Sequence, residues 1–232
     1  MEYLPNGFTI ELPQGTFPLS TDSVVLAHSV RLPKNARVLD LGSGCGTLGL
    51  LLCGQDPLCT VTGVELSEAS HAAAVENIRR NNLTGRMRSV REDLRQLPGE
   101  FRDGSFHVCV SNPPYFTGGP ASQNTPLARR DDCCSPDDLF QAASKALKFG
   151  GDLFLVHKPE KLAQLIGCGT RHGLEVKHLT LIRHKDGSPI SMILLQFKKG
   201  GKPGMQLHER CLFDSRGEPT DYYREVYHIK GD

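Results

Sequence analysis

Residues 37–46 of the chain, Arg-Val-Leu-Asp-Leu-Gly-Ser-Gly-Cys-Gly, decide the fold. A short apolar run surrounds Asp40 and leads into glycines at every second position. This order is typical of a buried parallel strand that turns directly into a helix, at the sheet edge where α/β proteins bind ligands. The dinucleotide fingerprint requires glycine at the position of Thr47, so the turn disfavours a pyrophosphate ligand.

Similar apolar runs recur along the chain, with helical patterns between them. The expected strands span residues 37–41, 60–66, 87–92, 106–111, 152–157, 175–182 and 190–197. The last two must form an antiparallel hairpin, because only a short turn separates them and a parallel crossover needs about a dozen residues or more. The pattern predicts an α/β, Rossmann-like fold with a mostly parallel seven-stranded sheet, helices on both faces and an antiparallel C-terminal hairpin.

Helices are expected over residues 21–31, 47–53, 68–81, 135–147 and 160–172. Thr21 is the expected N-cap of the first helix, and the third places Ala72, Val75 and Ile78 at core spacing. The fourth begins with Ser135, followed by proline and two acids, which is a strong helix start.

Length and composition fit one globular domain that does not span a membrane. The chain has 232 residues, of which 38% are hydrophobic and 23% charged, and it shows neither a signal peptide nor an apolar run of membrane length. Its eight cysteines lack CxxC spacing, so we expect reduced thiols, no metal and a cytoplasmic location. We expect residues 1–199 to form a single domain and the glycine-rich start of residues 200–232 to mark an exposed tail.

The net charge of +1, from 27 basic and 26 acidic residues, excludes a uniformly basic surface for nucleic acid. A local basic patch remains possible, because residues 171–216 hold nine basic and four acidic residues. Near-neutrality therefore predicts salt-sensitive contact with a polyanion through a patch.

Acids at the ends of three successive strands indicate a ligand with three kinds of polar group. Asp40 offers a carboxylate to a cationic amine, and Glu65 ends the second strand, where a carboxylate can accept both hydroxyls of a ribose. Asp93, after the third strand, can hold an adenine amino group. S-adenosylmethionine, an amino acid joined to adenosine, meets all three demands.

A second turn, Ser-Asn-Pro-Pro-Tyr-Phe over residues 111–116, follows the fourth strand. Consecutive prolines remove two N–H donors and leave carbonyls exposed as acceptors. The side-chain carbonyl of Asn112 and the backbone carbonyl of Pro113 can thus converge on a planar NH2 group. Tyr115 offers a flat face on which the ring that carries this amine can stack.

The glycine turn, Glu65, Asp93 and the Asn-Pro-Pro-Tyr turn together resemble the class I S-adenosylmethionine-dependent methyltransferases that act on amino nitrogens. Within this class, Asn-Pro-Pro-Tyr-Phe without a large target-recognition domain is similar to the family that methylates N6 of adenine 37 in bacterial valine tRNA. The resemblance covers roughly residues 15–198 and includes residues 14–22, which in that family close over the cofactor. Residues 128–131 resemble an Ala-Arg-His-Glu stretch, with Arg130 in place of the histidine.

The resemblance implies an enzyme in which the adenine N6 attacks the methyl group of S-adenosylmethionine in line, on a base presented unstacked in a tRNA anticodon loop. The implied catalytic residues are Asn112, Pro113 and Tyr115. The implied cofactor-binding residues are Asp40, Gly42, Gly44, Gly46, Glu65, Asp93, Leu94 and Thr21, within a domain whose residues 1–34 cover the cofactor. The implied substrate-binding residues are Pro114, Phe116, Arg129, Arg130, Lys198 and Lys199. We expect no metal and favour a monomer.

Two other functions stay open. An Asn-Pro-Pro-Tyr turn can also hold the amide of a glutamine side chain, as in protein glutamine N5-methyltransferases, but these usually carry an N-terminal helical domain, for which the residues before Arg37 leave no room. The second is a non-catalytic module that binds S-adenosylmethionine or RNA, and the intact Asn112 and Tyr115 speak against it.

Overall fold

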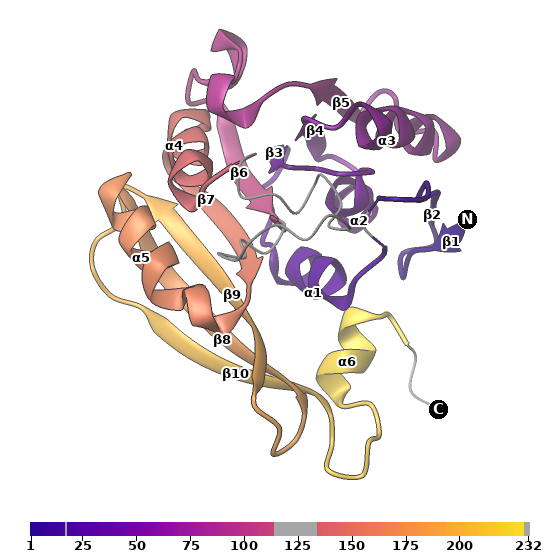
Figure 1. Cartoon of the computed structure of the whole chain (residues 1–232), viewed down its shortest axis with the longest axis vertical. Helices are drawn as coiled ribbons and strands as arrows, with labels where there is room; N and C mark the ends of the chain where they lie inside the picture. Colours follow the sequence, from indigo (N-terminus) through magenta and orange to yellow (C-terminus); the bar gives the residue numbers. More distant parts are fainter. Residues whose placement is uncertain (17, 114–133, 230–232) are drawn as a thin grey trace.

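The computed structural model describes residues 1–16, 18–113 and 134–229, which form a central sheet with helices on both faces (Figure 1). Near the N-terminus, β1 (Glu2–Tyr3) and β2 (Thr9–Ile10) form a small separate antiparallel pair. Among the described residues, no helix is long and apolar enough to cross a bilayer.

The main sheet has eight strands in the order β10-β8-β9-β7-β6-β3-β4-β5. Their bounds are β3 (Arg37–Leu41), β4 (Thr60–Glu65), β5 (Met87–Arg91), β6 (Phe106–Ser111), β7 (Leu147–His157), β8 (Leu174–Lys185), β9 (Ile190–Lys199) and β10 (Gln206–Phe213). Within this described sheet, β9 alone runs antiparallel to its neighbours. The expected Rossmann-like architecture and its β8–β9 hairpin are confirmed, with β10 as one strand more than expected.

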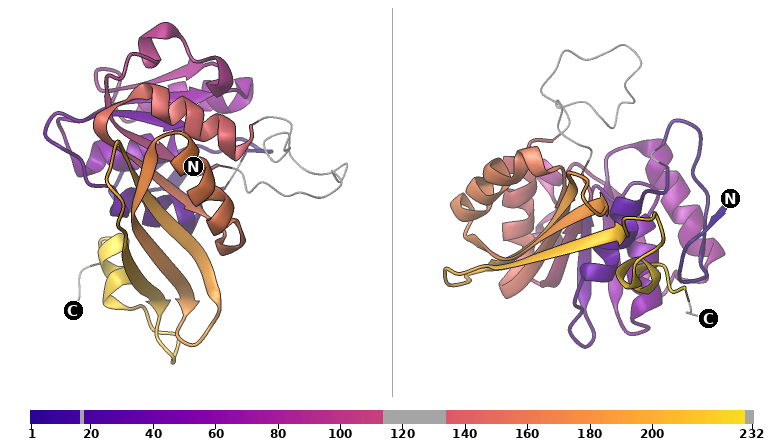
Figure 2. Two further views of the ribbon diagram at one scale, coloured as in Figure 1. Left: turned by 90° about the vertical axis from the view of Figure 1, so that its left-hand side faces the viewer. Right: turned by 90° about the horizontal axis from the view of Figure 1, so that it is seen from below.

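Helices cover the two faces of the sheet and give the molecule three layers (Figure 2). One face carries α1 (Thr21–Ser29), α2 (Thr47–Gln55), α3 (Glu68–Arg80) and α6 (Asp221–Val226), and the other carries α4 (Pro136–Ala146) and α5 (Leu162–Arg171). Short 3-10 turns are η1 (Leu94–Gln96), η2 (Gly99–Phe101) and η4 (Pro159–Lys161).

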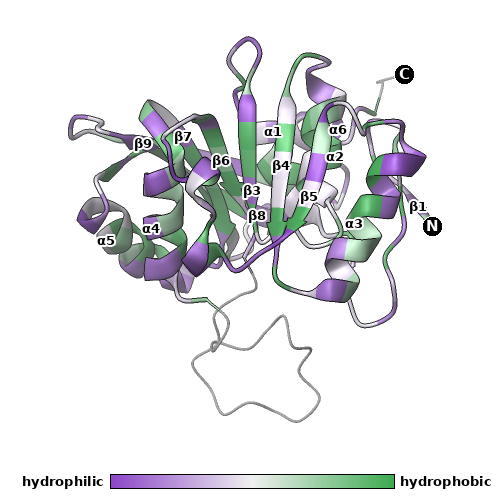
Figure 3. Cartoon of the chain, turned by 90° about the horizontal axis from the view of Figure 1, so that it is seen from above, coloured by the Kyte–Doolittle hydropathy of each residue, from purple (hydrophilic) through white to green (hydrophobic). Residues whose placement is uncertain are grey.

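Two apolar cores lie above and below the sheet, because successive side chains of a strand point to opposite faces. In β6, Val108 and Val110 face the core beneath α1 and α2, while Cys109 faces the core beneath α4 and α5. The central strands are therefore hydrophobic along much of their length (Figure 3). This double burial explains the continuous apolar runs in the sequence.

Two helix details differ from expectation. Ser20, not Thr21, caps α1, since its backbone is extended and its hydroxyl accepts a hydrogen bond from the Ser23 N–H. In α3, Val75 is 47% exposed and the buried face instead includes Asn77. Ile78 is buried as predicted, and Ala73 and Ala74 complete the buried face; a buried asparagine is invisible to a search for apolar spacing.

Residues 206–226, expected within an exposed tail, include β10 and α6, which pack on the domain although many of their residues are exposed. Strand β10 pairs with β8 in parallel, Gln206 opposite His178, and Leu212 and Val226 are buried. The glycines before β10 form a turn that brings the chain back: Gly200 and Gly204 have positive φ angles of 68° and 124°, which favour glycine. The glycines after residue 199 therefore do indicate a turn, and this turn connects two strands of the sheet.

Two glycines in α5 give a matched test of packing against the β9 side of the core. A Cβ on Gly169 would lie 2.6 Å from the Phe197 ring and 2.9 Å from the Leu174 carbonyl oxygen, whereas one on Gly167 would meet only the Arg171 guanidinium at 3.8 Å. We expect Gly169→Ala to lower the free energy of unfolding by about 1–3 kcal/mol. Gly167→Ala should raise it by up to about 1 kcal/mol. Urea denaturation measures both, and equal effects would contradict this account.

Candidate functional site

The glycine turn and the Asn-Pro-Pro turn lie side by side because β3 and β6 are neighbours in the sheet. The chain runs from β3 outward through β4 and β5 and then returns to pair β6 with β3 in parallel, with Asp40 opposite Val110. Such a reversal of strand order opens a crevice at the carboxyl ends of the strands. The Ser111 hydroxyl donates to the Leu41 carbonyl at 2.7 Å and ties the two strand ends together.

A pocket of about 80 Å³ occupies this crevice. It is lined by residues of the glycine turn, the start of α1 and α2, and the end of β6: Pro18, Ser20, Ser23, Asp40, Gly42, Ser43, Gly44, Cys45, Thr47, Leu48, Ser70 and Asn112. The structure therefore brings together four of the predicted residues, Asp40, Gly42, Gly44 and Asn112.

Asp40 is the most unusual residue of the pocket. Its side chain is 0% exposed, and neither carboxylate oxygen has a hydrogen-bond partner among the described residues. Burial, together with the nearby Glu65 carboxylate, raises the pKa of Asp40 to about 8. A buried acid without a partner is costly, so this carboxyl group is suited to a ligand that brings a positive charge.

The glycines divide into two roles. A Cβ on Gly42 or Gly44 would meet no protein atom within 4 Å, although both line the pocket, so a ligand can approach their backbone directly. Gly46 does not line the pocket. A Cβ there would lie 3.0 Å from the Met87 methyl group, so this glycine allows α2 to start close against β5.

Glu65 holds the glycine turn in shape. Its carboxylate accepts hydrogen bonds from the Gly44 N–H at 2.8 Å and from the Ser67 N–H at 2.7 Å. Each carboxylate oxygen keeps a further lone pair for a ligand hydroxyl. The predicted ribose contact therefore remains a proposal, with Glu65 already fixed in place.

Asn112 is anchored by a residue that the sequence did not single out. Its side-chain amide N–H donates to the Ser23 hydroxyl at 2.9 Å, and that hydroxyl lies 3.4 Å from the Ser20 hydroxyl. With its nitrogen used in this way, the side-chain oxygen of Asn112 is left as the acceptor. No sequence signal marked Ser23, because the contact spans 89 positions.

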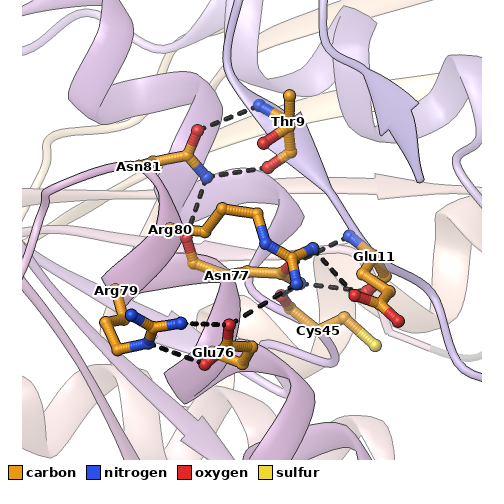
Figure 4. Close-up of polar contacts among 8 residues, drawn as sticks. All are labelled: Thr9, Glu11, Cys45, Glu76, Asn77, Arg79, Arg80 and Asn81. Atoms are coloured by element: carbon orange, nitrogen blue, oxygen red, sulfur yellow. Dashed lines mark hydrogen bonds and ion pairs between the residues drawn. The ribbon is translucent and has the colours of Figure 1, made fainter.

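The N-terminal strand β2 is fastened to α3 by two asparagines (Figure 4). Asn81 exchanges hydrogen bonds with the Thr9 backbone, and the buried Asn77 does the same with Glu11. Asn77 also donates to the Cys45 carbonyl at 3.1 Å, inside the glycine turn. The segment before α1 is thus linked to the turn that lines the pocket.

Besides Gly46 and Glu65, three further predicted cofactor residues do not line this pocket. Asp93 caps η1 and forms a bidentate ion pair with Arg95, with N···O distances of 3.0 and 2.6 Å. Leu94 packs against the core beneath α4 and α5. Thr21 receives a hydrogen bond from the Tyr227 hydroxyl at 3.2 Å, and its neighbours Ser20 and Ser23 line the pocket instead.

The two lysines predicted to bind substrate lie at the other edge of the sheet. Because β9 runs antiparallel, its end lies beside the start of β7, with Lys198 opposite Asp152. Lys198 forms an ion pair with Asp152 at 3.0 Å, and Lys199 donates to the carbonyls of Ser144 and Leu147. Both ammonium groups therefore already have protein partners, and their predicted contact with substrate stays a prediction.

The remaining predicted residues, Pro114, Tyr115, Phe116, Arg129 and Arg130, lie outside the described part of the chain. Pro113 is described and is buried at the end of β6. The seven described cysteines are all free thiols.

Comparison with known sequences gives one family and a consistent set of relatives. The model of the methyltransferase small domain matches residues 19–166. A tRNA1(Val) (adenine(37)-N6)-methyltransferase from Shewanella sp. (strain W3-18-1) is 34% identical over 221 residues, covering 92% of this chain and 90% of that protein. One of the same name from Photobacterium profundum is 27% identical, covering 85% and 84%.

Solved structures agree on the fold. A predicted O-methyltransferase from Agrobacterium tumefaciens superposes with a TM-score of 0.74 at 20% identity, covering 90% of this chain and 96% of that one. Geranyl diphosphate C-methyltransferase from Streptomyces coelicolor A3(2), in complex with S-adenosyl-L-homocysteine, gives a TM-score of 0.56 at 13% identity, covering 76% and 78%.

Proposed function

Because the chain belongs to the methyltransferase small domain family, we propose that it transfers a methyl group from S-adenosylmethionine to N6 of an adenine in tRNA. Its relatives named tRNA1(Val) (adenine(37)-N6)-methyltransferases span nearly its whole length and support this substrate. The observation that carries the proposal is the pocket in which Asp40 and Asn112 both lie.

The residues present fit S-adenosylmethionine, which supplies an electrophilic methyl group on a sulfonium when bound. Asp40, whose carboxylate has no partner among the described residues, receives the ammonium of the amino acid part. The backbone of Gly42 and Gly44 lies open beside it, and Glu65 stands at the end of β4 to accept ribose hydroxyls.

Asn112 and Pro113 act on the adenine amino group. This nitrogen is a poor nucleophile because its lone pair is delocalised into the purine ring. Hydrogen bonds from its N–H groups to the Asn112 side-chain oxygen and the Pro113 carbonyl localise electron density on nitrogen as the new bond forms. Both groups sit at the end of a buried strand, so their positions are fixed before the base arrives.

Methyl transfer to defined substrates tests the proposal. The chain is incubated with methyl-labelled S-adenosylmethionine and either unmodified valine tRNA, the same tRNA with guanine at position 37, or a release factor with a glutamine acceptor. We expect N6-methyladenosine in the first tRNA only, measured by nucleoside analysis. Label in the release factor would favour glutamine methylation, and binding of the cofactor without transfer to any of the three would favour a non-catalytic module.

Ser23 should act as a positioning residue for Asn112. Removal of its hydroxyl by Ser23→Ala leaves the Asn112 amide free to rotate, so we expect kcat to fall about tenfold, while the Kd for S-adenosylhomocysteine changes less than about twofold. Thr170→Ala is the control, because its hydroxyl bonds only within α5 at Ile166. Equal loss of kcat and cofactor affinity would show that Ser23 binds the cofactor instead.

A further inference from the structure

A second cavity, of about 340 Å³, lies away from the glycine turn and is larger than the pocket there. It is bounded by the end of α1, by α6, and by the sheet face over β8, β9 and β10; in Figure 1, α6 stands beside α1 and across from these strands. Its polar lining includes His28, Arg31, His178, His208, Arg210 and Tyr222. The proposed methyl transfer uses none of these residues.

Strand register places the sheet residues of the cavity on one face. Gln196 of β9 lies opposite Phe154 of β7 and His178 of β8, and β10 continues the face with His208 opposite Thr180. The cavity lies between this part of the face, the end of α1 and α6, while the end of β10 near Leu212 is buried with α6. Strand β10 and helix α6 therefore form part of the cavity wall.

The charge of the lining is mostly positive. The guanidinium groups of Arg31 and Arg210 form no ion pair with a described carboxylate, and Glu225 is the one acid among the described lining residues. Arg210 lies over the Tyr222 ring at 5.8 Å, and His28 meets the same ring edge-on at 6.0 Å. Arg31 follows the extended C-cap residue Val30 of α1, and both arginines line this cavity.

Flat rings complete the site. His178 and His208 are stacked with an interplanar angle of 16°, and their Nδ1 and Nε2 atoms are 3.2 Å apart. Burial lowers the pKa of His178, with the His208 charge adding to the effect, and burial also lowers that of His28. Near neutral pH these two imidazoles are uncharged rings that can stack on a base or hydrogen-bond to it.

We propose that this cavity binds a nucleotide, with the phosphate held by Arg31 and Arg210 and the base placed against the Tyr222 and histidine rings. A guanidinium fork matches phosphate oxygens, and a volume above about 300 Å³ is typical of small-molecule sites. The same chemistry is offered by a free mononucleotide and by one nucleotide of a single-stranded RNA.

Nucleotide binding is measured on the full chain with S-adenosylhomocysteine in excess, so that adenine at the glycine turn does not contribute. Titration with AMP should shift the ring-proton NMR signals of His28, His178 and His208 but not that of His107 on the far side, whose Nδ1 accepts from the Arg37 N–H. The Arg31→Gln/Arg210→Gln double variant should bind AMP at least about tenfold more weakly. Arg102→Gln, an exposed arginine after η2, is the matched control and should bind as wild type.

Two further titrations test the role of the phosphate and separate free nucleotides from RNA. Adenosine, which lacks the phosphate, should bind at least about tenfold more weakly than AMP. A short single-stranded RNA that displaces AMP assigns the cavity to RNA, and one that leaves AMP bound assigns it to free nucleotides. Absence of histidine shifts with both AMP and RNA in the wild-type chain, or equal affinity in the folded double variant, would overturn the proposal without touching the proposed methyl transfer.

Discussion

Asn112→Ala is expected to lower kcat for tRNA methylation by about 10²–10³-fold, since a preorganised acceptor at a reacting nitrogen is worth that much when removed. The substitution removes the side-chain oxygen that accepts a hydrogen bond from the adenine amino group. It leaves Asp40 and the glycine turn unchanged, so the Kd for S-adenosylhomocysteine should stay within about threefold of wild type. Single-turnover kinetics and calorimetry measure the two quantities.

Turnover of Asn112→Ala at the wild-type rate would contradict the proposal that the Asn112 side-chain oxygen acts as acceptor for the adenine amino group. Ser23→Ala is the matched comparison, because that variant keeps the Asn112 side-chain oxygen as acceptor and loses only the hydroxyl that holds the Asn112 amide. We expect kcat to decrease in the order wild type, Ser23→Ala, Asn112→Ala. The decrease from wild type to Ser23→Ala should be smaller than that from Ser23→Ala to Asn112→Ala.

Asp40→Asn should weaken the binding of S-adenosylmethionine by about 10²-fold or more, the cost of losing one partner of a buried charge pair. The wild-type carboxyl group, with its pKa at about 8, is mostly protonated at pH 7 without a ligand. Bound ammonium favours the carboxylate, so cofactor binding at pH 7 should release a proton. Calorimetry in buffers of different ionisation enthalpy measures this proton, and Asp40→Asn should not release it.

The same substitution should raise stability, in opposition to its effect on binding. The Asp40 carboxyl has its ordinary pKa of 3.8 when unfolded and about 8 when folded, so between these values the folded chain holds one more proton. Its contribution to stability therefore falls as the pH rises from about 4 to about 8. Asp40→Asn should match wild type near pH 4 and exceed its Tm by several degrees at pH 8, at roughly 2–4 °C per kcal/mol.

Asp186→Asn, in the exposed turn between β8 and β9, is the control. It should change neither the affinity for S-adenosylmethionine nor the Tm. A Tm difference between Asp40→Asn and wild type that does not depend on pH would show that the Asp40 carboxyl is not held protonated in the free protein.

Local sequence signals predicted the parts of the fold that depend on neighbouring residues. The glycine turn, the buried strands and the helix start at Ser135 all follow from short-range chemistry and are present in the structure, where Ser135 and Asp138 form a capping box. The predicted cap at Thr21 failed by one position, because Ser20 is an equally good cap and only the tertiary position of α1 separates them.

Features that depend on distant contacts could not be predicted in this way. Asp93 looked available as a ligand, but Arg95 folds back onto it. Lys198 and Lys199 were predicted to bind substrate, and only the register of β9 against β7 shows that Lys198 pairs with Asp152 and that Lys199 donates to the Ser144 carbonyl. The cavity beside α6 draws on residues from His28 to Glu225, a spacing for which no sequence pattern exists.

Strand β10 also decides which edge of the sheet meets solvent. Without it, the hairpin would end in β8, a strand of 12 residues with apolar side chains and an unpaired row of N–H and C=O groups, which invites pairing with another chain. β10 covers that row and presents an outer edge with Glu209 and Arg210, both exposed. The returning C-terminal segment thereby protects the molecule against edge-to-edge aggregation.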